Sequence, residues 1–281
     1  MQRVEATHVT HLFAKDLPRI AKVDPGETFQ VETRSSSRVA TGPIFVRGCD
    51  AGDVLAIKIL DIELPGEAAM WILPGRGVYG EYLADRISGR IVRPIPLVDG
   101  HAVFREDIRI PLNPMVGVIG VAPAAMEQLT FWPGRHGGNL DCKEVTTGAT
   151  LYLPVATQGA LLGVGDVHAA MGDGEIMLTG VESTATVTLQ VEVLRGKSLR
   201  HPFVEDARCI YALASHRSID RAILMAIEEM IELLCAQLGL KLEEAGMLIS
   251  AAADVGICQV VNPMVTARVA MPKVVAPTLR V

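Results

Sequence analysis

Glycine and proline interrupt this chain at short intervals, and this punctuation limits the possible fold more than any other feature of the sequence. Between Gln30 and Pro123, the pairs Gly42-Pro43, Pro65-Gly66 and Pro74-Gly75 separate short apolar stretches. Proline has no backbone N–H and glycine readily adopts left-handed conformations, so both favour turns over helix interiors. Short apolar stretches bounded by such turns predict the strands of a β-barrel or β-sandwich.

Three stretches show what kinds of strand to expect. Residues 29–33 alternate apolar and polar side chains, which is typical of a half-buried strand. Residues 54–60 are almost uniformly apolar, as in a strand that is covered on both faces. Residues 184–194 alternate again, with Val187, Leu189, Val191 and Val193 on one face. This last stretch is therefore expected to be a strand with one dry and one wet side.

The period of the apolar residues changes to that of a helix after Ser218. From Ile219 to Leu238 they recur three and four positions apart, with Ser218 placed as an N-cap and Gly239 as a C-terminal stop. A second, shorter helix is predicted over residues 242–252. The fold class is thus mainly β with an α+β portion: a sandwich-like or barrel-like body followed by a C-terminal helical segment.

This pattern divides the chain into two portions. Residues 1–200 form the predicted β-rich body, which contains the polar loops described below. Residues 201–281 form the α+β portion packed on it. Whether these portions are two domains or one is left open at this point.

The composition excludes several classes of function. With a net charge of -6 and 4% aromatic residues, the 281-residue chain offers neither a basic surface nor a stacking platform, so no nucleic-acid partner is expected. No apolar stretch approaches the roughly 18 residues of a membrane-spanning helix, so no membrane partner is expected. The first residues lack the apolar core of a signal peptide, and the five cysteines show no CxxC spacing. These features predict a cytoplasmic protein with reduced thiols.

Two glycine-rich segments, residues 133–143 and 165–175, concentrate polar side chains. In order, these are His136, Asn139, Asp141, Lys143, Asp166, His168, Asp173 and Glu175. If residues 166–168 are extended, Asp166 and His168 project from the same face. Asp173-Gly174 then predicts a turn, and Glu175 is expected to open the next strand.

Imidazole and carboxylate groups together are a common first coordination shell for Zn²⁺ or another divalent cation. The spacing matches no zinc signature such as HExxH, so the pattern predicts a polar site and leaves the metal as one possibility. Structural alternatives remain open: Asp173 as a turn residue, Asp166 as a backbone cap and His168 as a packed core histidine. Cys142 as a nucleophile is a further alternative, since Lys143 next to it could lower its pKa.

The same segments resemble the acetamidase/formamidase family. The first matching motif is His136-Gly-Gly-Asn-Leu-Asp141 with Lys143, and the second is Gly165-Asp-x-His-Ala-x-Met-Gly-Asp-Gly-Glu175. Supporting similarity lies in residues 41–46, 52–55, 114–123 and 259–263. The resemblance runs from about His11 to Pro272 without large gaps.

This resemblance implies a β-rich fold, hydrolysis of the carbon–nitrogen bond of short linear amides such as formamide and acetamide, and release of ammonia. It also implies a homodimer or larger homo-oligomer and a divalent metal ion, with Zn²⁺ first and Ca²⁺ or another cation as alternatives. The implied metal ligands are His136, Asp141, His168 and Asp173. The implied catalytic residues are Glu175, Asp166, Glu182, Asn139 and Lys143, with the general base among the acids not assigned.

One departure from the family concerns the substrate. Arg76 stands between Gly75 and Gly77, where the resemblance implies an apolar residue. A guanidinium that lines the pocket would favour a larger or carboxylate-bearing amide, whereas one that points to solvent would leave acetamide-like substrates as the expectation. A non-catalytic protein that binds a small molecule or a metal on the same scaffold is the alternative of another class.

Overall fold

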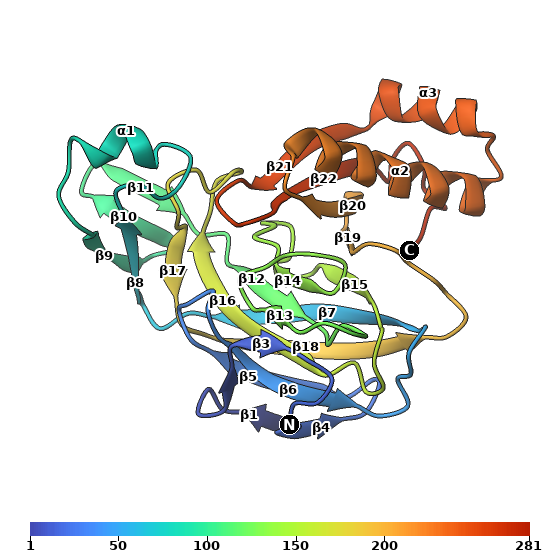
Figure 1. Ribbon diagram of the computed structural model, residues 1–281, viewed down its shortest axis with the longest axis horizontal. Coiled ribbons are helices and arrows are strands. Elements are labelled where there is room, and N and C mark those ends of the chain that lie inside the picture. The colour runs from blue at the N-terminus through green and yellow to red at the C-terminus, as the bar shows by residue number, and fades with distance from the viewer.

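The computed structural model describes residues 1–281, and strands make up most of its regular structure (Figure 1). Two large sheets form the body, an arm projects from one end of it, and two long helices cover the C-terminal strands. The predicted fold class, mainly β with a C-terminal helical segment, is confirmed.

The first sheet has nine strands, and its order places β18 at a central position of the body. In spatial order the strands are β1 (Gln2–Val4), β5 (Thr28–Thr33), β18 (Ala185–Leu194), β7 (Val54–Glu63), β15 (Thr150–Pro154), β19 (Phe203–Glu205), β20 (Cys209–His216), β22 (Val265–Pro272) and β21 (Asp254–Gln259). In β18 the predicted alternation is confirmed, because Val187, Leu189 and Val191 are fully buried. The expectation for β7 holds over Val54–Ile57, but Leu60 is 42% exposed, so the second half of this strand has a solvent-facing side.

The second sheet carries the polar loops. Its main path is β11 (Ile108–Pro111), β10 (His101–Arg105), β9 (Ile91–Val98), β8 (Glu67–Ile72), β17 (Val181–Ser183), β16 (Leu162–Ala170), β12 (Met115–Gly120) and β14 (Gly137–Asn139). β6 (Ala40–Val46) also pairs with β16, and β2 (Val9–Thr10) and β4 (Ala21–Val23) pair with β6. A separate pair is formed by β3 (Leu12–Phe13) and β13 (Gln128–Leu129). Every residue of β12 and β16 is buried, so these strands form a rigid base for the groups they carry.

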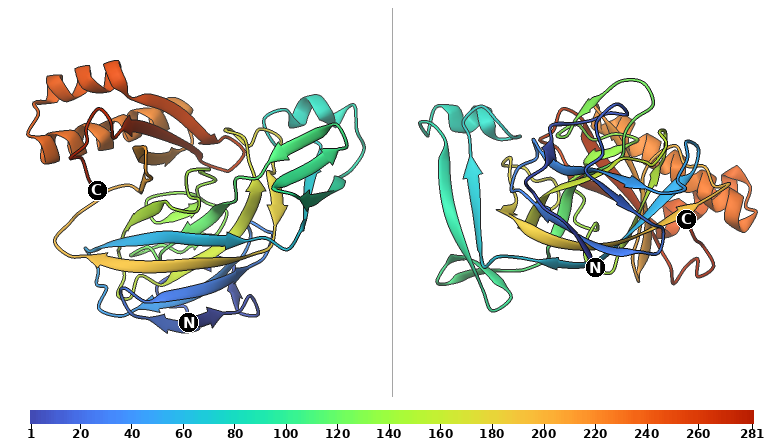
Figure 2. Two further views of the ribbon diagram at one scale, coloured as in Figure 1. Left: turned by 180° about the vertical axis from the view of Figure 1, so that it is seen from behind. Right: turned by 90° about the horizontal axis from the view of Figure 1, so that it is seen from below.

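The projecting arm consists of β8, β9, β10, β11 and the short helix α1 (Gly80–Ala84), seen apart from the body in all three views (Figures 1 and 2). The sequence pattern did not predict α1. This helix has five residues, and its N-cap, Tyr79, makes no side-chain capping hydrogen bond. The arm matters for function because its base lies beside the polar loops.

The C-terminal helices begin and end where the sequence predicts. In α2 (Ile219–Leu238), the Ser218 hydroxyl accepts a hydrogen bond from the backbone N–H of Arg221, and Gly239 ends the helix with a φ of 67°. The second helix is α3 (Leu242–Ala252). The buried stripe of α2 packs on β20 and β22 in a core cluster separate from that of the body.

The sheet itself runs without interruption across residue 200, because β19 pairs with β15 of the body. The division at that residue stays a prediction. None of the helices has the length and apolar character needed to cross a membrane.

Candidate active site

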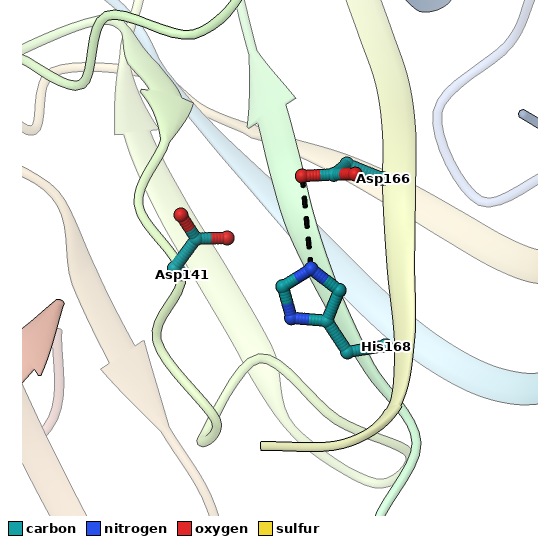
Figure 3. A group of neighbouring side chains, drawn as sticks. All are labelled: Asp141, Asp166 and His168. Carbon is teal, nitrogen blue, oxygen red and sulfur yellow. Dashed lines mark ion pairs between the residues drawn. The ribbon is translucent and has the colours of Figure 1, made fainter. Parts of the chain in front are cut away.

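His168 lies at the centre of a buried polar group on β16. Its Nε2 atom is 3.7 Å from Asp166 Oδ2, so the two side chains of the D-x-H motif do meet on one face, as expected (Figure 3). The neighbouring strand β17 pairs Glu182 directly with His168, and Glu182 Oε1 is 3.0 Å from Nε2. Strand register therefore brings together residues that lie 14 positions apart in the sequence.

Two further acids reach the same histidine from loops. Asp141 follows β14 and faces His168 (Figure 3), and the side-chain amide of Asn262 donates a 2.8 Å hydrogen bond to its Oδ2. Glu175 Oε1 is 4.0 Å from His168 Nε2. We refer to Asp141, Asp166, His168, Glu175 and Glu182 as the acid–histidine cluster.

Glu175 does not open a strand, contrary to the sequence prediction. Asp173-Gly174 turns the chain as expected, but the following residues stay in a turn and the next strand, β17, begins at Val181. The reason is that Gly174 pairs with the end of β21: the backbone N–H of Val260 donates to the carbonyl of Gly174 at 3.0 Å. This contact holds the loop against the sheet and directs Glu175 towards His168.

The cluster is buried, and several of its polar atoms have no partner in the protein. The side chains of its members are at most 8% exposed. Both ring nitrogens of His168, Oδ1 of Asp141 and Oδ1 of Asp166 lack a hydrogen bond, since even the 3.0 Å approach of Glu182 to Nε2 does not have hydrogen-bond geometry. Buried polar groups are almost always satisfied in native proteins, so this arrangement indicates that the cluster binds something.

The backbone of the cluster is also unusual. Asp141, Asp166 and Glu175 have φ values of 42°, 51° and 47°, in the left-handed region that residues other than glycine rarely adopt. Such conformations cost about 1–3 kcal/mol each and are maintained where the surrounding structure imposes them, often at functional sites. Here all three point a carboxylate towards one histidine.

The electrostatics of the cluster follow from burial and crowding. Burial, together with the neighbouring carboxylate of Asp166 or Glu182, raises the pKa of Asp141 and of Asp166 to about 6 each. Burial also raises the pKa of Glu175 well above its usual value. For His168, burial opposes the charge, but Glu182 and Asp166 outweigh it and raise the pKa. The cluster thus holds more negative charge than its single imidazole can balance.

Two glycines make room for the cluster. A Cβ atom at Gly117 of β12 would lie 2.4 Å from Asp141 Oδ1 and 2.8 Å from the carbonyl oxygen of Asp166. A Cβ atom at Gly180 would lie 2.9 Å from His168 Nδ1. Both positions are therefore restricted to glycine by the groups in front of them.

The change Gly117→Ala should destabilise the protein by about 1–3 kcal/mol, because the added methyl group overlaps atoms that β16 and the Asp141 loop cannot easily move. The matched control is Gly246→Ala in α3, where an added Cβ meets no atom within 4 Å. That change should instead stabilise the helix by up to about 1 kcal/mol. Urea unfolding of both variants measures the difference, and equal effects would show that Gly117 is not sterically restricted.

Three residues predicted for the site lie outside the cluster. His136 is buried with its ring edge against Phe13, at a centroid distance of 5.3 Å, and burial lowers its pKa to about 4. Asp173 instead pairs with Arg268, at 3.0 and 2.8 Å, and with Lys143 at 3.0 Å. The structure thus does not bring His136, Lys143 or Asp173 to His168.

Cys142 has the features of a structural thiol. It is fully buried, burial raises its pKa well above the usual value, and its Sγ donates a hydrogen bond to Glu144 at 3.2 Å. A low pKa and access to solvent are what a nucleophilic cysteine requires. The nucleophile alternative therefore has no support.

A cavity of about 580 Å³ opens beside the cluster. Asn139, Asp166, Glu175 and Glu182 line it, so the acids are accessible from this side. Arg76 also lines this cavity and is exposed, so it lies at the rim, between the pocket and the solvent.

The sequence analysis missed other residues of the site. Asn262, which orients Asp141, and the lining residues Arg38, Trp71, Arg90 and Phe131 were not predicted to belong to it. The only sequence signal for Asn262 was its place in a segment that supports the family resemblance.

Comparison with known proteins shows which family this chain belongs to. The model of the acetamidase/formamidase family matches residues 121–276, which include every member of the cluster. The chain belongs to the acetamidase/formamidase family. The resemblance stated from the two motifs is thereby confirmed.

Solved structures of this family superpose closely on the chain. An acetamidase of Bacillus halodurans is 36% identical, with a TM-score of 0.94 over 99% of this chain and 100% of its own. A protein of Thermoanaerobacter tengcongensis described as a predicted acetamidase/formamidase is 35% identical, with a TM-score of 0.93 over 99% of this chain and 97% of its own. The whole fold, arm and C-terminal helices included, is therefore a family fold.

Among curated family members, the formamidase of Methylophilus methylotrophus is 24% identical over 64% of this chain and 62% of its own length. The chain spans less than two thirds of the length of the curated relatives it matches. The homodimer or larger oligomer implied by the resemblance stays a prediction.

Proposed function

We propose that this chain hydrolyses the carbon–nitrogen bond of small linear amides, such as formamide and acetamide, and releases ammonia. The observation that supports it best is the acid–histidine cluster: buried, strained, unsatisfied and open to a cavity. The names of the relatives, acetamidase and formamidase, point to the same reaction. A protein that only bound a small molecule would not need several buried acids with raised pKa values.

The cluster fits a divalent cation. Two sets of side chains place one ligand atom each within 4.8 Å of one another: Asp141, Asp166 and His168, and His168, Glu175 and Glu182. Their unpartnered oxygen and nitrogen atoms are the donors that a cation would satisfy. A cation would also balance the excess negative charge of the cluster. The candidate ligands His136 and Asp173 are not in either set, so we keep Asp141 and His168 as proposed ligands and add Asp166 and Glu182.

The donor set also bears on which cation is bound. Imidazole is a usual ligand of Zn²⁺ and other transition metals, whereas Ca²⁺ takes oxygen ligands. His168 belongs to both sets and supplies an imidazole nitrogen to each of them. We therefore propose Zn²⁺ or a similar transition metal ion, not Ca²⁺. When bound, such an ion polarises a carbonyl oxygen and lowers the pKa of a coordinated water.

The residues of the chain supply the remaining requirements of amide hydrolysis. Glu175 lies on a loop at the cavity wall and has a raised pKa, so it is placed to take a proton from water and later give it to the departing ammonia. Asn139 lines the same cavity, and its Oδ1 atom is buried without a partner, so it can accept a hydrogen bond from the substrate amide N–H. Lys143 is held by Asp173, and we assign it no catalytic role.

We further propose that the protein works in the cytoplasm. All five cysteines are free thiols, and three of them are buried in the fold. Free thiols are the normal state of cysteine in a reducing compartment.

Ammonia release from a panel of short amides tests the proposed reaction. Purified protein supplied in turn with Zn²⁺, Mn²⁺, Fe²⁺ or Ca²⁺ should release ammonia from formamide, acetamide or propionamide, with the transition metals most effective. Glu175→Gln, which keeps the shape of the side chain but cannot take a proton, should lower kcat by about 10²–10⁴-fold. No turnover of any amide with any cation would reject the proposal.

A further inference from the structure

The rim of the active-site cavity carries three arginines from separate segments of the chain. Arg38 lies in the loop after β5, Arg76 in the turn after β8, and Arg90 immediately before β9; all three line the cavity. We infer, on the basis of the proposed function, that the substrate is a short amide with a carboxylate at its other end, and that Arg76 and Arg90 bind this carboxylate.

The three guanidinium groups are free to bind an anion. The arginines that form salt bridges are others: Arg3, Arg47, Arg105, Arg200 and Arg268. Two of the rim arginines are held by aromatic rings instead of by acids, with Arg90 4.7 Å from the centre of the Trp71 ring and Arg38 5.6 Å from that of Phe131. Stacking on a ring orients a guanidinium without using its N–H donors, which remain available for a carboxylate.

Negative and positive side chains lie at opposite ends of the cavity. Its inner wall carries Asp166, Glu175 and Glu182, which would repel an anion, while the rim carries the arginines. An uncharged amide group is therefore expected at the acids and a negative group at the rim. Plain acetamide has no group that could use the arginines.

The size of the cavity points the same way. A volume of about 580 Å³ lies within the range of sites that hold ligands much larger than acetamide. A substrate with a few carbon atoms between its amide and its carboxylate would place the amide against the acids and the carboxylate against the arginines. Trp71 and Leu178, which also line the cavity, provide apolar surface for such a chain.

The test compares succinamate, which has an amide and a carboxylate, with succinamide, in which a neutral amide replaces the carboxylate. The enzyme should have a kcat/KM at least about tenfold higher for succinamate. Each of Arg76→Gln and Arg90→Gln should lower that value by about 10–100-fold, mainly through KM, because a charge-assisted hydrogen bond is lost. The values for succinamide and acetamide should change less than about threefold.

Arg109→Gln is the matched control, since Arg109 is exposed on β11 of the same arm but does not line the cavity. Arg76→Lys and Arg90→Lys, which keep the charge but not the paired donors, should recover part of the preference. Equal kcat/KM for succinamate and succinamide in the unmodified enzyme, or equal losses for both in the glutamine variants, would overturn the inference while leaving amide hydrolysis intact.

A binding measurement separates failure of the inference from failure of the proposed function. Succinate, which has no amide bond to hydrolyse, should bind in isothermal titration calorimetry with an affinity that falls at least about tenfold in Arg90→Gln. Arginine-dependent binding of succinate without hydrolysis of any amide would retain the anion site and reject the reaction. Hydrolysis of neutral amides without succinate binding would retain the reaction and overturn the anion site.

Discussion

Replacement of His168 by alanine is expected to lower kcat/KM for acetamide by at least about 10²-fold, with loss of the bound cation. His168 is the one residue that all the other members of the cluster approach, and its side chain is fully buried. Without the imidazole, the carboxylates would face one another with no cationic or neutral nitrogen donor between them. Elemental analysis and ammonia release measure the two effects.

Because truncation at a buried position also leaves a hole, His168→Gln serves as a second variant that retains a polar side chain of similar length. Near-ultraviolet circular dichroism of both variants reports whether the core remains packed. His136→Ala is the comparison at another buried histidine, outside the cluster, and it should retain its cation. Normal metal content together with normal turnover in either His168 variant would contradict the assignment of the site.

The sequence predicted those parts of the fold that are governed by local rules. The helix over Ile219–Leu238 has its apolar stripe, a capping serine and a terminal glycine within 22 consecutive residues, and all three features operate locally. The alternation of β18 is equally local, since one buried face requires every second residue to be apolar. By contrast, α1 has no side-chain cap, and its five residues are too few to show a helical period. No local signal in the sequence therefore predicted it.

For the site, the sequence predicted one meeting of side chains within a single strand. Asp166 and His168 of β16 do approach each other, although Asp166 has a left-handed φ of 51° and not the extended conformation on which the prediction rested. Contacts between segments far apart in the chain had no local signal: His136 packs on Phe13, more than 100 positions earlier in the chain. Asp173 is similarly taken by Arg268, 95 positions later. A single sequence contains no sign of such partners, and Arg38 and Arg90 at the cavity were missed for the same reason.

Removal of the cation is expected to abolish amide hydrolysis and to make stability fall as pH rises. In the cation-free protein, burial and neighbouring carboxylates raise the pKa of Asp141 and of Asp166 from 3.8 to about 6. Between these two values the folded state binds more protons than the unfolded state. The contribution of these two groups to the free energy of unfolding is therefore highest below about pH 4, and it decreases as pH rises through 6.

The size of the effect follows from the same shifts. A carboxyl group that titrated alone over such an interval would contribute roughly 3 kcal/mol, and the coupled pair is expected to contribute less than twice that amount. The reference is the double variant Asp141→Asn with Asp166→Asn, whose amides do not titrate. Cation-free wild-type protein should fall progressively further below this variant in melting temperature as pH rises from 4 to 7.

Returning the cation distinguishes a metal site from a simple cluster of acids. Zn²⁺ should raise the melting temperature of the wild-type protein at pH 7 and restore ammonia release, because the ion binds only the folded state and balances the ionised carboxylates. The asparagine variant, which lacks two of the proposed ligands, should show neither effect. Protein shown by elemental analysis to be free of metal, yet still hydrolysing acetamide at the normal rate, would rule out the metal site and leave the acids to act alone.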